Sequence, residues 1–181
     1  MTASLSFRIG DKVVYPNHGV GVIEHISSRG AGESDQLFYL LRIESSNLRV
    51  MVPCANAVNV GMRALTQACE LATILDFLGR PEAVASSTDW KWRFKENSDK
   101  MRGGSLGQVA EVLKSLVQLH QAKPLSFREK KMLDRSVILL AGEMASAHNL
   151  SQTEALTTLA AALEKAALVL PPLEQPEDLH V

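Results

Sequence analysis

The chain has little cysteine and no clustered metal ligands. Among its 181 residues there are two cysteines, Cys54 and Cys69, which do not form a CxxC motif. We therefore expect free thiols in a reducing compartment rather than a disulfide framework or a thiolate zinc site. The five histidines are scattered, and none is spaced from a cysteine or carboxylate as metal ligands are. The sequence predicts no metal site and no other cofactor.

The chain also lacks a long hydrophobic run and an excess of charge of one sign. No stretch approaches the roughly 18 consecutive apolar residues of a transmembrane helix. Residues 1–12 contain no apolar segment of the kind found in signal peptides. We therefore expect a cytoplasmic protein that makes no contact with membranes. The formal net charge is −1 at pH 7, so any binding to nucleic acid must come from a local basic patch.

Sequence motifs typical of enzymes are absent as well. There is no Walker A motif, no GxGxxG fingerprint and no GxSxG elbow. The two glycines of "HGVGV" lie between expected strands, which is the wrong context for a phosphate-binding loop. No residue stands out as a nucleophile, so we expect neither an enzymatic activity nor a small-molecule substrate.

What the sequence does contain is a change of hydrophobic pattern near residue 60. Before it, short runs of Val, Ile, Tyr and Phe are separated by Gly, Asn, Ser and Pro, a pattern typical of strands and turns. Turns recur about every ten residues, which favours a small antiparallel barrel or a strongly bent sheet. In the run "NLRVMVP", alternation should place Arg49 and Met51 on the face opposite Val52.

After this point the apolar residues recur with helical spacing. Helices are predicted after Thr66, across "SLGQVAEVLKSLVQLHQ", from Ser126, and from Ser151 to the double proline. Each of these two serines is followed three residues later by a glutamate, Glu129 or Glu154, which is the pattern of a capping box. The apolar stripes expected to face the core comprise Val109, Val112, Leu113, Leu116, Val117, Leu133, Val137, Leu140, Ala141 and Met144.

The predicted fold class is therefore α+β, with three segments. Residues 1–60 should form the small β domain and residues 61–166 a bundle of four or five helices. Residues 167–181 are rich in proline and acidic side chains, so we expect a disordered tail. Within the helical part, "GRPEAVASSTD" is expected to be a flexible link.

Both tryptophans of the chain fall in one basic segment, "STDWKWRFKENSDKMRGG". If it is a helix capped by Thr88 or Asp89, helical spacing puts Trp90 and Phe94 on one face and Trp92 on the opposite one. Two interpretations are open. Periodicity alone favours packing of Trp90 in the bundle beneath a solvated basic face. Alternatively the first ring of the helix stays outside, where it stacks on a base or wedges into a base step while basic neighbours neutralise phosphates.

Five stretches carry a resemblance to a known family. They are "FRIGDKVVYPNHGVGVIEHI" (7–26), "VPCANAVNVGMRAL" (52–65), "DWKWRFKENSDKM" (89–101), "VAEVLKSL" (109–116) and "LSFREKKMLDRSVILLAGEMA" (125–145). In this order and spacing they resemble the CarD/CdnL family of bacterial transcription regulators. The N-terminal module of that family is shared with transcription-repair coupling factors.

The resemblance implies a Tudor-like barrel that binds the β subunit of RNA polymerase. It also implies a helical domain that reaches promoter DNA near the minus-ten element, with the protein acting as a monomer on the polymerase. A tryptophan of this domain wedges into the minor groove at the upstream edge of the bubble and stabilises the open complex. This tryptophan matches Trp90. Basic positions near the DNA match Arg93, Lys95 and Lys130.

Two further residues join the candidate DNA-binding set. Lys91 stands between the tryptophans, and Trp92 occupies a position where the family often has a basic residue. This departure either weakens a phosphate contact or adds a second stacking ring. The resemblance reverses the preference from periodicity, so Trp90 should be the exposed wedge and the two tryptophans should differ in exposure. The competing hypothesis is a protein–protein interaction module in which Trp90 is buried and no DNA is contacted.

On the polymerase side the resemblance points to three residues, and one of them departs from the family pattern. Arg29, after the second strand, matches a basic position of the family. Met51 stands where the family has another basic residue, with Arg49 two positions earlier on the same face. A methionine keeps an apolar contact but cannot replace a charge-assisted hydrogen bond.

Overall fold

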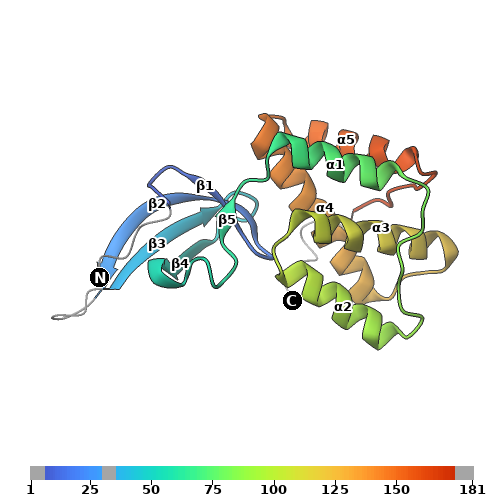
Figure 1. Ribbon diagram of the computed structural model, residues 1–181, viewed down its shortest axis with the longest axis horizontal. Helices are drawn as coiled ribbons and strands as arrows, with labels where there is room; N and C mark the ends of the chain where they lie inside the picture. The colour runs from blue at the N-terminus through green and yellow to red at the C-terminus, as the bar shows by residue number, and fades with distance from the viewer. Residues whose placement is uncertain (1–6, 30–35, 174–181) are drawn as a thin grey trace.

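The computed structural model describes residues 7–29 and 36–173. Within these residues an antiparallel sheet and a set of five helices lie side by side along the long axis of the molecule (Figure 1). The strands precede all the helices in the chain, apart from one short 3-10 turn. The predicted α+β class is confirmed.

The sheet is open rather than closed on itself. Its spatial order is β4-β3-β2-β1-β5, and the paired strands are antiparallel. A register shift between Ile23 and His25 marks a bulge in β2, and a bulge bends a strand. Because β5 pairs with β1, the sheet continues past the boundary expected at residue 60. The strands are β1 (Lys12–Tyr15), β2 (Gly19–Arg29), β3 (Gln36–Ile43), β4 (Arg49–Pro53) and β5 (Arg63–Ala64).

One face of the sheet covers a small core of its own. Tyr39 is fully buried there, and its hydroxyl accepts a hydrogen bond from the N–H of Phe7 at 3.3 Å. In β4, Val52 is buried while Arg49 and Met51 are exposed, as the alternation predicts. The core residues of the sheet are Val13, Ile23, Tyr39, Leu41, Val52, Ala57 and Met62.

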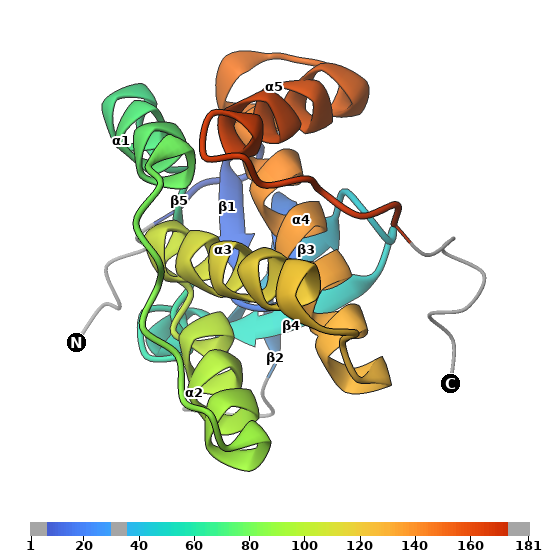
Figure 2. The ribbon, with the colours of Figure 1, turned by 90° about the vertical axis from the view of Figure 1, so that its right-hand side faces the viewer.

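The helices pack around α3 and α4. Figure 2 shows α1 and α5 next to each other on one side of α3 and α2 on the other side. A 3-10 turn, Cys54–Asn56, follows β4 within the sheet domain. The helices are α1 (Ala68–Gly79), α2 (Trp90–Arg102), α3 (Leu106–Ala122), α4 (Phe127–His148) and α5 (Gln152–Glu164).

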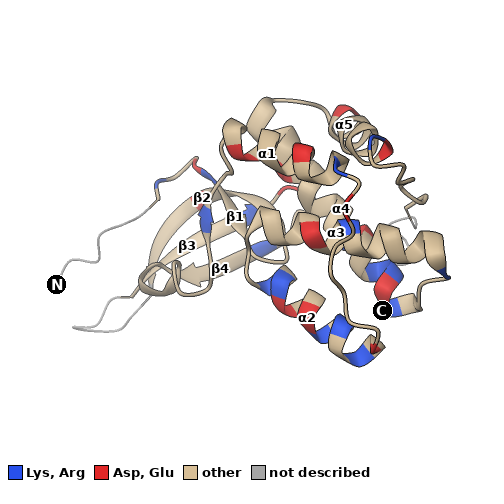
Figure 3. Ribbon diagram, turned by 45° about the vertical axis from the view of Figure 1, so that its right-hand side comes forward, with Lys and Arg blue, Asp and Glu red and all other residues tan. Residues whose placement is uncertain are grey.

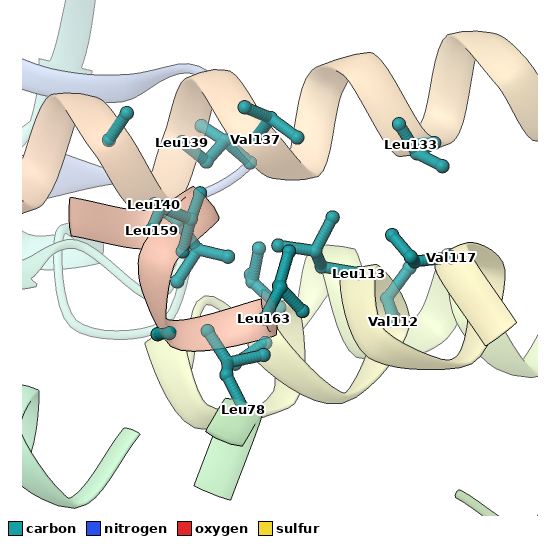
Figure 4. Close-up of a cluster of buried hydrophobic side chains, with 14 of the residues drawn as sticks. Leu78, Val112, Leu113, Val117, Leu133, Val137, Leu139, Leu140, Leu159 and Leu163 are labelled. Atoms are coloured by element: carbon teal, nitrogen blue, oxygen red, sulfur yellow. The ribbon is translucent and has the colours of Figure 1, made fainter. Parts of the chain in front are cut away.

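The apolar stripes predicted from helical spacing form the core of this bundle. All ten predicted residues of α3 and α4 are buried. Figure 4 shows several of them, Val112, Leu113 and Val117 on one helix and Leu133, Val137 and Leu140 on the other, together with Leu78, Leu159 and Leu163. The hydrophobic effect over this contiguous cluster is the main stabilising contribution to the helical part.

Both predicted capping boxes are confirmed, but α5 is shorter than expected. Its helical hydrogen bonding stops at Glu164 instead of reaching the double proline. Ala167 adopts a positive φ of 55°, and the N–H of Leu168 donates back to the carbonyl of Leu163. This turn brings Leu168, which is 4% exposed, back onto the core. Burial of one leucine therefore ends a segment whose composition would allow a longer helix.

The segment "GRPEAVASSTD", expected to be a flexible link, is attached along α3. Lys114 is 1% exposed, and its ammonium donates to the carbonyl of Arg80 at 2.6 Å. One turn later, the side-chain oxygen of Gln118 accepts a hydrogen bond from the N–H of Val84 at 3.0 Å. Two polar side chains of α3 thus bind the backbone of the link.

The described residues add two negative observations. None of their helices is long and apolar enough to span a bilayer. They also contain no group of three or more His, Cys, Asp or Glu side chains that could hold a metal ion. Cys54, which is half-buried, and Cys69, which is exposed, are both free thiols.

The capping box of α5 can be tested by Ser151→Ala. The hydroxyl of Ser151 accepts a hydrogen bond from the N–H of Glu154 at 3.2 Å, and losing such a cap costs about 1 kcal/mol. Chemical denaturation should show a loss of this size in the free energy of unfolding. Thr153→Ala, at an exposed position of the same turn, should show none, and equal stability of the two variants would contradict the assignment.

Candidate functional site

The basic tryptophan segment folds as α2, and Asp89 is its cap. The Oδ1 atom of Asp89 accepts a hydrogen bond from the N–H of Lys91 at 2.8 Å, which satisfies one of the free donors at the helix start. Trp90 is therefore the first residue of the helix. Of the two caps considered from the sequence, the structure selects Asp89 over Thr88.

Both tryptophan side chains are exposed. Trp90 is 53% exposed and Trp92 is 64% exposed. The packing of Trp90 favoured by periodicity is therefore wrong, and so is the expectation that the two rings differ clearly in exposure. The interaction-module hypothesis loses the buried tryptophan on which it depended.

Trp90 is exposed although it lies on the inner stripe of its helix. Arg93, Asn97 and Met101 continue this stripe, and all three are buried. Arg93 packs against Glu129, which belongs to the first turn of α4. Trp90 lies one turn before Arg93, and α4 has no turn before the one that carries Glu129 to cover the ring. The bundle ends beneath Trp90, and the ring extends past it.

Each tryptophan has an ammonium group beside it. The Nζ atom of Lys91 lies 5.9 Å from the ring centroid of Trp90, and that of Lys95 lies 5.4 Å from the ring of Trp92. Both lysine side chains are exposed. Lys95 thus accompanies Trp92, not Trp90. A flat ring with a cation at its edge can bind a base by stacking and a nearby phosphate by charge.

Arg93 occupies a different place from the one expected by resemblance. It is 4% exposed. Its Nη2 and Nε atoms donate to the Oε1 atom of Glu129 at 2.6 and 3.0 Å, and its Nη1 atom donates to the carbonyl of Ser87 at 2.9 Å. This buried, paired guanidinium does not suit a phosphate contact, because reaching DNA would leave the carboxylate of Glu129 buried without its partner.

Glu129 joins the start of α4 to α2. Its Oε2 atom accepts hydrogen bonds from the N–H and hydroxyl of Ser126, at 3.0 and 2.7 Å, to complete the capping box of α4. Its other oxygen binds Arg93 of α2. Burial raises the pKa of Glu129, but the hydrogen bonds from Arg93 and Ser126 outweigh it and hold the pKa below its ordinary value. The capping box was visible in the sequence, whereas this second partner was not.

Further basic side chains stand at the start of α4. Lys130 is exposed next to Glu129, at the same end of the bundle as the tryptophans. The guanidinium of Arg128 lies 5.9 Å from the ring of Phe94, and the ammonium of Lys131 lies 4.5 Å from the ring of Phe127. Arg128 and Lys131 were not predicted from the sequence, although both lie beside the residues of the capping box.

Arg128 and Lys131 border a groove between α2 and α4. The groove has a volume of about 410 Å³, and its described lining contains no acidic residue. Figure 3 shows Lys and Arg along α2 and at the start of α4. The groove is lined in part by Phe94, Met101, Arg102, Arg128, Lys131 and Met132.

The second half of α2 is close to neutral. The ammonium of Lys100 lies 3.3 Å from Glu96 and 3.1 Å from Glu111. Arg102 lies 3.8 Å from Asp99. Among the described residues, Lys91 and Lys95 at the tryptophan end of the helix take part in no ion pair, unlike Lys100 and Arg102.

The candidate polymerase contacts divide into two groups. Arg49 and Met51 lie on the outward face of the edge strand β4, with 69% of the Arg49 side chain and 40% of Met51 exposed. The carboxylate of Glu24 in β2 forms ion pairs with both Arg49, at 3.3 Å, and Arg42, at 2.7 Å. Arg29 ends β2 in register with Gln36, and its side chain lies outside the described residues. Pairing therefore places Arg29 toward the opposite end of the sheet from Arg49.

The pair between Glu129 and Arg93 predicts a dependence of stability on pH. A carboxyl group whose pKa is lowered by folding stabilises the fold above its unfolded pKa, and this contribution is lost as the pH falls through the folded pKa. Wild type should therefore exceed Glu129→Gln in free energy of unfolding at neutral pH, and the gap should shrink from about pH 4.5 downward. Chemical denaturation at a series of pH values measures this gap. Glu111→Gln, at an exposed ion pair, is the control, and a gap for Glu129→Gln that does not change with pH would refute the assignment.

Two family models match the chain in sequence order. The model described as "CarD-like/TRCF RID domain" matches residues 7–66, and the model described as "CarD, C-terminal domain" matches residues 73–160. The first match spans the sheet through β5, and the second lies within the helical part. Domains of the first type interact with RNA polymerase in general.

A relative from another organism agrees with these matches. YdeB of Bacillus subtilis (strain 168), whose name describes it as a candidate transcription factor, is 36% identical to the chain over 138 residues. The alignment covers 76% of this chain and 90% of that protein. Identity of this extent, with both domains matched in order, supports a role in regulating transcription. The chain belongs to the CarD family of transcription regulators.

Proposed function

We propose that the chain binds the β subunit of RNA polymerase through its sheet and stabilises the promoter open complex by wedging Trp90 into the minor groove. The wedge would act at the upstream edge of the bubble, near the minus-ten element. The observation that carries the proposal is a tryptophan, 53% exposed, at the first residue of a helix whose next turn is fixed by a buried ion pair. An exposed but firmly based ring is what a wedge requires.

The proposed wedge works by exchanging one set of contacts for another. Inserting an apolar ring between base steps costs a few kcal/mol of unstacking, which contacts with the bent DNA offset. Lys91 beside Trp90, Lys95 beside Trp92 and Lys130 at the start of α4 are exposed and can neutralise phosphates. Arg93 contributes by fixing the base of the wedge instead of touching DNA. The Asp89 carboxylate at the helix start reduces the attraction of the helix dipole for phosphate.

Trp92 is proposed to be a second stacking ring. It is exposed, and two positions along a helix turn a side chain about 200° away from Trp90. The two rings therefore cannot enter one base step together. The family often has a basic residue at the position of Trp92. Because Lys95 lies beside the Trp92 ring, a positive charge is still present there. We expect Trp92 to reach a different nucleotide from the one that Trp90 reaches.

The edge of the sheet is the proposed polymerase contact. In the described sheet, β4 is paired on one side only, with β3. An edge strand of this kind can add a strand from a partner, and outward side chains supply specificity. Arg49 offers charge and Met51 offers apolar surface. We propose that one copy of the chain binds one polymerase, in the cytoplasm.

Binding to DNA alone should be weak. The exposed lysines around Trp90 are few, and the rest of α2 is neutralised by acidic partners. Affinity for DNA grows with the number of phosphates neutralised. The polymerase would therefore deliver the tryptophans to the promoter, through the high effective concentration that the first contact creates.

The wedge can be tested by Trp90→Ala. This variant should shorten the lifetime of a promoter open complex about fivefold or more relative to wild type, corresponding to the ~1–3 kcal/mol of one stacked ring. Lifetimes are measured with purified polymerase after a competitor challenge. Binding to polymerase alone and thermal stability should not change, because the ring is exposed. A lifetime equal to that of wild type, or no effect of the wild-type chain itself, would sink the proposal.

The polymerase contact can be tested by Arg49→Glu. This change reverses the charge on the proposed contact surface and also breaks the ion pair with Glu24. Capture of RNA polymerase in a pull-down should therefore fall strongly, while binding to forked DNA should stay the same. Arg80→Glu changes an exposed arginine of the helical part to the same residue and serves as the control. Equal capture by both variants would show that β4 is not the contact.

A further inference from the structure

We infer that Arg63 is a positioning residue that holds the sheet and the helical part, with its tryptophan-bearing helix α2, in one fixed orientation, so that the two proposed binding surfaces act together. The inference rests on the proposed function, since fixed orientation matters only if both surfaces bind. It does not follow from the family resemblance or from any of the candidate site residues. Its basis is a buried junction between β5, α4 and the turn after α2.

The first element of the junction is a two-pronged ion pair. The Nη1 and Nη2 atoms of Arg63 donate to the Oε1 and Oε2 atoms of Glu143 at 2.6 and 2.9 Å. Arg63 belongs to the sheet and Glu143 to α4. The Glu143 side chain is 3% exposed and that of Arg63 is 28% exposed. Paired hydrogen bonds of this kind fix direction as well as distance.

Thr66 completes the surroundings of the carboxylate. Its N–H and its hydroxyl donate to the Oε1 atom of Glu143 at 2.8 and 2.6 Å. Thr66 lies in the short connection between β5 and α1. The buried carboxylate is therefore bound by both the last strand of the sheet and the connection that leaves it. A hinge at this connection would have to break these hydrogen bonds in a buried place, which is costly.

The third donor of Arg63 reaches the helix that carries the tryptophans. Its Nε atom donates to the carbonyl of Gly104 at 2.8 Å. Gly104 lies just after α2, has a φ of +76°, and would place a Cβ atom 3.1 Å from the ring of Pro16. Pro16 belongs to the turn between β1 and β2. The end of α2 is thus packed directly on the sheet, in a conformation and a space that favour glycine.

These contacts fix α2 at both ends. At its start, the pair of Arg93 with Glu129 ties it to the beginning of α4. At its end, Arg63 and Pro16 tie it to the sheet. The junction therefore contributes to the direction of Trp90 relative to β4. The same interface has other contacts: Arg135 of α4 donates to the carbonyl of Asn17, buried Leu139 lies beside Gly19, and the exposed Ser146 hydroxyl donates to Glu44 at 2.9 Å.

A fixed orientation has a measurable consequence. When two sites on one molecule bind two points of one target, the second contact is strengthened by an effective concentration that depends on geometry. Two domains joined by a loose interface would sample many orientations and lose much of this gain. Loosening the junction should therefore weaken binding to the assembled polymerase–promoter complex while leaving each separate contact intact.

The experiment compares Arg63→Lys, Glu143→Gln and the control Ser146→Ala in the full chain. Arg63→Lys keeps the charge but loses the paired donors and the contact with Gly104. Each protein is titrated against a β-subunit fragment alone, forked DNA alone, and the polymerase–promoter complex. Arg63→Lys should bind the first two like wild type and the third about 10- to 100-fold more weakly. Ser146→Ala should match wild type in all three titrations.

An orientation readout that does not depend on function accompanies the titrations. Spin labels on Val58→Cys and Val169→Cys, which replace exposed side chains of the sheet domain and the helical part, report the distance between the two parts once Cys54 and Cys69 are replaced by serine. Wild type should give one narrow distance distribution and Arg63→Lys a broad one. If the wild-type chain binds neither partner, the proposed function fails, and the distance distributions still test the junction.

Two results would overturn the inference. One is an Arg63→Lys protein with a narrow distribution and full affinity for the assembled complex. The other is loss of folding in both Arg63→Lys and Glu143→Gln, since the junction would then serve the stability of the fold and not the orientation of its parts. If Arg63→Lys alone fails to fold, the distance distribution of Glu143→Gln is used instead, because this variant keeps the size and most hydrogen bonds of the site. A broad distribution supports the inference, and a narrow one contradicts it.

Discussion

The buried ion pair between Arg93 and Glu129 is the interaction on which the rest of the site depends. It lets an exposed tryptophan stand on a fixed base, because the residue one turn after Trp90 is bonded to the first turn of α4. Glu129 caps that helix at the same time. Burying two charges gains little net stability over apolar packing, but it penalises every arrangement that separates them. The pair therefore specifies where α2 begins its contact with the bundle, and so where the ring is left outside.

A second buried glutamate on the same helix has a corresponding role at the other side of the molecule. Glu143 binds the sheet through Arg63, as Glu129 binds α2 through Arg93. Helix α4 thus connects the proposed DNA-contacting end with the sheet whose edge is proposed to bind the polymerase. In both cases an arginine pairs with a buried glutamate of α4, and for Arg93 this replaces the DNA contact that the resemblance implied. The exposed lysines, which carry less geometric specificity, remain for phosphates.

The sequence predicted the parts of this structure that local spacing determines. The stripe of α3 and α4, the capping boxes at Ser126 and Ser151, and the strand alternation around Val52 were all correct, because each needs only neighbours a few residues away. The site depends on longer distances. Arg63 and Glu143 are 80 residues apart in the chain, and no local pattern joins them. Periodicity put Trp90 on the right face but could not show where the partner helix ends, and resemblance assigned Arg93 a role without its burial.

The central claim is that the polymerase places Trp90 at the upstream edge of the promoter bubble. The most direct measurement replaces Trp90 with a photo-crosslinking phenylalanine derivative and maps the crosslinked nucleotides on a promoter fragment. The account predicts crosslinks to bases at the upstream edge of the minus-ten element, formed only when polymerase is present. Crosslinks confined to protein, or to DNA positions that do not depend on polymerase, would contradict it.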